Sequence, residues 1–111
     1  MSFCHNKQYE REFANLMCSQ GHHCERVAGS GSAKEAVCDC ILFMDRKCFL
    51  VEVKATKEKV FYIRKHVREQ LELMRETAAR QDVNSLLAVK FKHRGWQQFD
   101  ITEKIPEVIR C

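Results

Sequence analysis

The chain has 111 residues, of which 45% are hydrophobic and 31% charged, with only 4 glycines and 1 proline. This composition excludes disordered, fibrous and low-complexity proteins, and the length fits a single domain, residues 1–111, with a small core. The 19 Lys and Arg residues against 15 Asp and Glu residues give a net charge of +4, which is too modest to specify a partner by itself.

The sequence shows no sign of a membrane-spanning or targeting segment. No stretch approaches the roughly 18 consecutive apolar residues of a spanning helix, and the first residues lack the apolar core of a signal peptide. We therefore expect an intracellular, cytoplasmic protein with no membrane partner. The seven cysteines are irregularly spaced and form no paired CxxC motifs, so we expect reduced, mostly structural thiols unless the source is a hyperthermophile. A zinc site using Cys38, Cys40 and His22 or His23 is the alternative.

The first predicted element is a helix over residues 8–20, which ends at Gly21. Its apolar stripe repeats with helical spacing and consists of Tyr9, Phe13, Leu16 and Met17 together with Gln20. A short strand over 22–27 follows. The next stretch, residues 28–34, contains mainly small residues and predicts a mobile loop.

The rest of the chain alternates strands with one further helix. We expect strands over 37–44 and 47–55 with Asp45-Arg46 between them, a helix over 64–80, and strands over 86–92 and 96–101. The structure of the tail over 102–111, which Pro106 interrupts, is left open. The order αβββαββ predicts an α/β domain with a mixed, twisted sheet flanked by helices.

Basic residues gather in the second half of the chain. Six of them lie between Lys54 and Arg68 against the single acid Glu58, and a second cluster consists of Lys90, Lys92, His93 and Arg94. Aromatic residues lie among them, namely Phe61, Tyr62 and Trp96. Such clusters suit a polyanion, although a solvated charged surface explains the charge alone equally well.

Two strands bring together the residues that carry chemistry. With Asp45-Arg46 as a two-residue turn, the numbers of opposed residues sum to 91, so that residue 39 lies opposite residue 52. Opposed residues point to the same side of an antiparallel pair, and Lys54 shares the face of Glu52, about 7 Å away. Asp39, Glu52 and Lys54 therefore converge. The alternative is an exposed network on an ordinary sheet face.

This convergence suits metal-assisted phosphodiester hydrolysis. Two carboxylates on an apolar hairpin repel each other, and a hard divalent cation such as Mg²⁺ removes that repulsion. Lys54 beside it can lower the pKa of an attacking water or offset the charge of the transition state. Glu10 adds a third acid, at the margin of the first helix's apolar stripe. By its position alone, Glu10 more simply marks the boundary with solvent.

The ordered set of motifs resembles the archaeal-type Holliday junction resolvases, within the broader PD-(D/E)xK nuclease superfamily. The resemblance spans residues 9–101 and rests on Tyr9-Glu10-Arg11-Glu12-Phe13, Arg26-Val27-Ala28-Gly29-Ser30-Gly31-Ser32, Asp39, Val51-Glu52-Val53-Lys54, Phe61-Tyr62-Ile63, Leu87-Ala88-Val89-Lys90-Phe91 and Gly95-Trp96. A lone ExK motif is weak evidence, whereas the ordered set is strong.

The resemblance implies a role for several positions. Glu10, Asp39 and Glu52 would surround Mg²⁺, with Mn²⁺ as a substitute, Lys54 would assist the water or the transition state, and Ser30 would be the loop serine that the family needs for cleavage. DNA contacts would come from Arg11 and Arg26 near the scissile phosphate, and the basic clustering adds Lys57, Lys59, Arg64, Lys65 and Arg68. Gln70 matches a position that is often polar in the superfamily.

Two departures from the family stand out: Cys38 replaces the proline that often precedes the first strand acid, and the tail after the last strand is short. The tail residues Ile101, Ile105, Val108 and Ile109 fit either a subunit interface or the chain's own core. We predict a Mg²⁺-dependent crossover junction endonuclease, acting as a homodimer in DNA recombination and repair. The alternatives are a nuclease of the same fold that cuts other DNA structures, a module that binds junctions without cutting, and a zinc-stabilised regulator.

Overall fold

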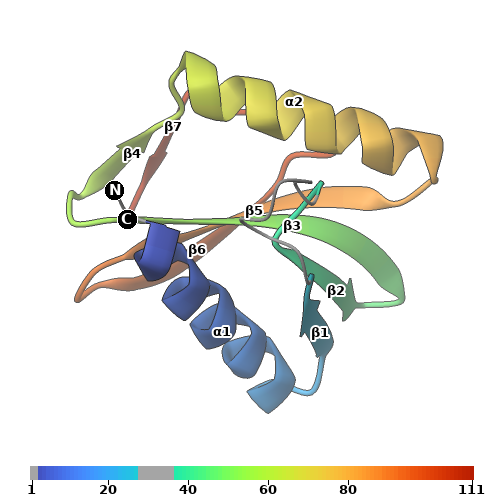
Figure 1. Cartoon of the computed structure of the whole chain (residues 1–111), viewed down its shortest axis with the longest axis horizontal. Coiled ribbons are helices and arrows are strands. Elements are labelled where there is room, and N and C mark those ends of the chain that lie inside the picture. Colours follow the sequence, from blue (N-terminus) through green and yellow to red (C-terminus); the bar gives the residue numbers. More distant parts are fainter. Residues whose placement is uncertain (1–2, 28–36) are drawn as a thin grey trace.

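The computed structural model describes residues 3–27 and 37–111, with side chains from residue 7 onward. A five-stranded sheet lies between two helices, one on each face, and a two-stranded ribbon lies beside the start of the second helix (Figure 1). The elements are α1 (Phe3–Ser19), β1 (His23–Arg26), β2 (Cys40–Met44), β3 (Lys47–Thr56), β4 (Val60–Tyr62), α2 (Lys65–Arg80), β5 (Asn84–Phe91), β6 (Gly95–Asp100) and β7 (Val108–Arg110). This arrangement confirms the predicted α/β class and its mixed sheet.

The sheet has the strand order β1-β2-β3-β5-β6, in which β3 and β5 run parallel and the other neighbours antiparallel. A parallel pair needs a long crossover connection, which β4 and α2 supply here. Because β3 and β5 are parallel, their carboxyl ends meet at the same end of the sheet. The ends of both strands, the ribbon and the start of α2 are therefore neighbours (Figure 1).

Each face of the sheet carries its own hydrophobic core, because alternate residues of a strand point to opposite faces. On the α1 face, Phe13 and Met17 pack with Val51 and Val53 of β3. On the α2 face, the buried side chains come from α2, β5 and the tail, namely Leu71, Met74, Leu87, Val89, Phe91, Ile101, Ile105 and Ile109. The tail thus folds onto the chain's own core, which decides between the two alternatives for its isoleucines.

Two local signals in the sequence act as expected. Gly21 adopts φ +91° two residues after the end of α1, where the His22 N–H donates to the Met17 carbonyl and closes the helix. The β2–β3 hairpin turns through Asp45 and Arg46, both with positive φ, the conformation that matches the twist of the flanking strands. The register follows, with Ile41 opposite Leu50 and Met44 opposite Lys47, as the sum of 91 predicts.

Several predicted bounds were wrong. Helix α1 begins at Phe3 instead of residue 8, and β2 begins at Cys40 instead of residue 37, while most other bounds shift by one or two residues. The strands β4 and β7 were not predicted at all. They pair with each other in an antiparallel ribbon, so the tail contributes a strand to the fold. The predicted loop over 28–34 lies outside the described residues, and within the described ranges no helix is long and apolar enough to cross a membrane.

Candidate active site

The candidate site lies where β2 starts beside the longer β3. Pairing between the two strands begins at Cys40 and Val51, whereas β3 continues to Thr56. Asp39 stands at this step, and its carboxylate accepts a hydrogen bond of 2.9 Å from the Val53 N–H. The Asp39 side chain thus accepts the hydrogen bond that a residue of β2 would accept if the β2–β3 pairing continued. This hydrogen bond fixes the Asp39 carboxylate at the edge of β3.

Glu10 reaches the same step from α1 and is 2% exposed. Its Oε1 lies 3.7 Å from the Nε of Arg26, at the end of β1, but this buried oxygen has no hydrogen-bond partner in the described structure. An unpartnered carboxylate oxygen in a protein interior is costly. The interpretation of Glu10 as a residue at the solvent boundary is therefore wrong.

Glu52 and Lys54 approach from the α2 face of β3. The Lys54 ammonium lies 3.4 Å from Glu52 Oε2 and donates a hydrogen bond of 3.0 Å to Gln70 Oε1 on α2. The side chains of Glu52 and Lys54 are 15% and 17% exposed, respectively. The alternative of an exposed network on a sheet face is wrong, because both groups are largely buried. Gln70, a residue named only through the resemblance, holds the lysine between the sheet and α2.

The three acids influence one another's ionisation. Burial, and then the negative charge of Asp39, raise the pKa of Glu10 to about 7, against a lowering effect of Arg26. Burial and the charge of Asp39 likewise raise the pKa of Glu52 to about 7, against the effect of Lys54. Burial also raises the pKa of Asp39. Repelling carboxylates crowded into one partly dry site are characteristic of functional sites.

The donor set fits a hard cation. Mg²⁺ binds oxygen ligands and is usually held by one or two carboxylates, with waters and substrate phosphate in its other positions. The three acids offer only oxygen, and Glu10 contributes a buried oxygen without a partner. Among the residues described, no three His, Cys, Asp or Glu side chains are grouped closely enough to form a preformed metal site. The same observation leaves the zinc site without a ligand cluster in these ranges.

The predicted DNA-contacting residues lie in different surroundings. Arg11 is exposed on α1 beside Glu10, and Arg26 lies against Glu10 itself. Arg68 is half-buried and donates to the Pro106 carbonyl at 3.1 Å, so that it braces the tail with part of its guanidinium. Lys65 is exposed at the start of α2, and an open cavity is lined by Lys57, Lys59 and Arg64. Ser30, which is predicted to assist cleavage, lies outside the described residues.

One contact near the site was not foreseen from the sequence. Glu12, two residues after Glu10, accepts hydrogen bonds from Lys90 Nζ at 2.6 Å and from Trp96 Nε1 at 3.0 Å. The Trp96 ring also packs on Phe13, with the ring centroids 5.3 Å apart. Two members of the second basic and aromatic cluster therefore anchor α1 to β5 and β6. The sequence around Glu12 carries no signal for these partners, which lie 78 and 84 residues further along the chain.

A family model and a solved structure match this chain, the first by sequence and the second by fold. Residues 3–109 match the family model described as archaeal Holliday junction resolvase. Among solved structures, the chain is similar to Hjc of Archaeoglobus fulgidus, a Holliday junction resolvase from an archaeal hyperthermophile. The TM-score is 0.71 at 24% sequence identity, over 94% of this chain and 87% of that chain, a likeness of fold. The comparison with curated proteins found no similar sequence.

Proposed function

The chain belongs to the archaeal Holliday junction resolvase family, and from this premise we propose that it is a Mg²⁺-dependent endonuclease that resolves four-way DNA junctions. It cuts paired phosphodiester bonds and serves DNA recombination and repair. The observation that supports this proposal best is the meeting of Glu10, Asp39, Glu52 and Lys54 at the start of β2, with a buried Glu10 oxygen left unpartnered.

The three carboxylates are the residues that would hold the cation. When bound, a divalent cation polarises the phosphodiester and lowers the pKa of a coordinated water. Asp39 is held in place by the Val53 N–H, and Glu52 is oriented by its ion pair with Lys54. Manganese, which also accepts oxygen ligands, would substitute for magnesium.

The neighbouring cations prepare the site for a phosphate. Lys54 is fixed between Glu52 and Gln70, so its ammonium is positioned to donate a hydrogen bond to a phosphoryl oxygen as negative charge develops there. Arg26 lies beside Glu10, and Arg11 follows Glu10 on the exposed side of α1, where both can contact the scissile phosphate group. By the family resemblance, Ser30 would assist cleavage from its loop.

A homodimer is part of the proposal. A four-way junction has approximate two-fold symmetry and requires matched cuts in two strands, so a symmetric pair of active sites suits it. The tail isoleucines are buried in the chain's own core, and the dimer must therefore use another surface. Size-exclusion chromatography with light scattering should give the mass of two chains for the protein. A protein mass of one chain in the complex with junction DNA would refute the dimer.

The central experiment compares substrates and metals. A labelled synthetic junction and a linear duplex of the same length are incubated with the protein, with Mg²⁺, with Mn²⁺ and with a chelator. We expect symmetric cuts near the branch point of the junction only when a divalent cation is present. Flaps and mismatched duplexes run alongside test the nuclease alternative, and tight junction binding without any cut would favour the non-catalytic module.

A further inference from the structure

A second feature of the molecule lies outside the carboxylate site. The connection from β3 to α2 and the β5–β6 turn together form an open cavity of about 540 Å³. Its lining consists of Lys57, Glu58, Lys59, Val60, Tyr62, Arg64 and Arg94. The cavity begins just beyond the candidate site, because Lys57 follows Lys54 by three residues, roughly 10 Å of extended chain.

The charges in this cavity are unbalanced. Four of the lining residues are cations and only Glu58 is an acid. Each of the ion pairs found in the described ranges involves other cations, namely His23, Arg26, Lys54 and Lys90. Clustered positive charges that lack acidic partners repel one another and attract anions. A phosphate group entering the cavity would relieve this repulsion.

The cavity also carries an exposed aromatic ring. Tyr62 is 52% exposed, and the Arg64 guanidinium lies 5.2 Å from its ring centroid. The tyrosine lies on a well-supported ribbon, because the neighbouring Ile63 N–H donates to the Glu107 carbonyl and Ile109 on the paired strand is buried. A rigid ring next to a cation offers stacking at little cost in conformational entropy.

We propose that this cavity binds one unstacked nucleotide of a branched DNA substrate, with its base on the Tyr62 ring and its phosphates between Lys57, Lys59 and Arg94. Aromatic stacking combined with a basic groove is the usual physical basis for binding unpaired nucleotides. Bases inside a duplex are already stacked, so the cavity favours DNA whose stacking is interrupted at a branch point. This inference rests on the proposed function and adds to it a determinant of substrate selectivity.

The binding test uses matched aromatic substitutions. Phe43, on β2, is 51% exposed and provides a control of nearly equal exposure outside the cavity. We expect Tyr62→Ala to weaken binding to a four-way junction roughly tenfold while leaving binding to a linear duplex unchanged, and Tyr62→Phe to retain tight junction binding. Phe43→Ala should match the unsubstituted protein. Equal junction binding by Tyr62→Ala and Phe43→Ala would overturn the proposal.

Photochemical cross-linking separates stacking from simple charge attraction. A junction with 5-iododeoxyuridine at the branch point, and a single-stranded oligothymidylate that carries the same base, are irradiated with the protein and mapped by mass spectrometry. We expect the main adduct on Tyr62 with both probes. Adducts only at other residues would overturn the proposal. If the protein bound no junction but oligothymidylate still reacted at Tyr62, the cavity would stand and the proposed function would fail.

Discussion

At the scale of single residues, the candidate site holds more negative charge than its own cations neutralise. Glu10 and Asp39 approach each other with Arg26 on one side, while Glu52 meets Lys54 on the other. Burial and the charge of Asp39 raise the pKa of both glutamates to about 7. The folded protein without metal therefore carries an electrostatic cost at neutral pH, and this cost has a measurable consequence.

We predict that the metal-free protein loses stability as the pH rises from about 4.5 to about 7. In this window the folded glutamates keep protons that the unfolded chain has released, so the folded state binds more protons and its stability falls with pH. One pKa unit corresponds to about 1.4 kcal/mol, and the total should reach a few kcal/mol. Urea unfolding with a chelator, at about pH 5 and about pH 8, measures it.

Substitutions identify the groups responsible for this pH dependence. The double change Glu10→Gln with Glu52→Gln should flatten the stability profile, whereas Glu103→Gln, at an exposed position in the tail, should leave it unchanged. Glu12 has a lowered pKa because Lys90 donates a hydrogen bond to it, so its contribution is lost only as the pH falls below the ordinary glutamate range. A rise in stability between the two pH values would show that burial does not govern these acids.

The single change Glu52→Gln should abolish cleavage. The amide keeps the size of the carboxylate but removes the charge that would hold the cation beside the phosphate, and metal activation is among the largest contributions to rate. Junction binding should persist or strengthen, because less negative charge faces the DNA. Gel assays of cleavage and binding on the same junction measure both effects, with Glu103→Gln as the control. Cleavage near the unsubstituted rate would remove Glu52 from the active site.

At the scale of elements, structure that depends on neighbouring residues was predicted well, whereas structure that depends on distant residues was not. The β2–β3 hairpin register follows from a two-residue turn and hydrophobic alternation, both of which lie within the hairpin itself. The β4–β7 ribbon pairs segments of only three residues that lie far apart in the chain, so neither carries a recognisable pattern. The burial of Glu10 likewise depends on β1 and β2 packing beside α1, which the helical pattern alone cannot reveal.

The contact of α1 with β5 and β6 predicts a structural role for Glu12. Glu12→Ala should destabilise the fold by about 1–3 kcal/mol, since it leaves the partly buried Lys90 ammonium and Trp96 N–H without their acceptor. Cleavage should fall as well, because the same helix carries Glu10. Glu12→Gln keeps an acceptor oxygen and should lose less stability. Urea unfolding ranks the variants, and equal stability of Glu12→Ala and the unsubstituted protein would contradict the role of this anchor.

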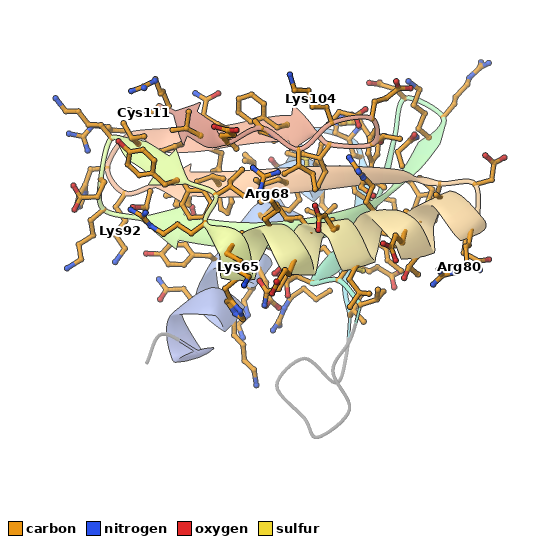
Figure 2. All side chains as sticks on the ribbon, turned by 90° about the horizontal axis from the view of Figure 1, so that it is seen from above. Lys65, Arg68, Arg80, Lys92, Lys104 and Cys111 are labelled. Carbon is orange, nitrogen blue, oxygen red and sulfur yellow. The ribbon has the colours of Figure 1, made fainter. Side chains whose placement is uncertain are left out.

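At the scale of the whole molecule, one end of the sheet collects positive charge. The parallel strands β3 and β5 end side by side, so that the basic residues that follow them are brought together with the start of α2. In Figure 2, Lys65 and Lys92 lie toward one end of the molecule, while Arg80 lies at the opposite end of α2. The sequence predicted the basic excess, but only the crossover topology places Arg94 beside Lys57 and Lys59.

This polarity predicts a steep and localised dependence of junction binding on salt. Each phosphate neutralised by a cation contributes about −0.9 to the slope of log affinity against log salt. We expect Lys57→Gln and Lys59→Gln each to make the slope shallower by nearly that amount. Lys47→Gln, at the opposite end of the ten-residue β3, should leave it unchanged. Fluorescence anisotropy with a labelled junction across a salt series gives the slopes. A slope close to zero for the unsubstituted protein, or an equal change for Lys47→Gln, would show that this end of the sheet is not where the DNA backbone binds.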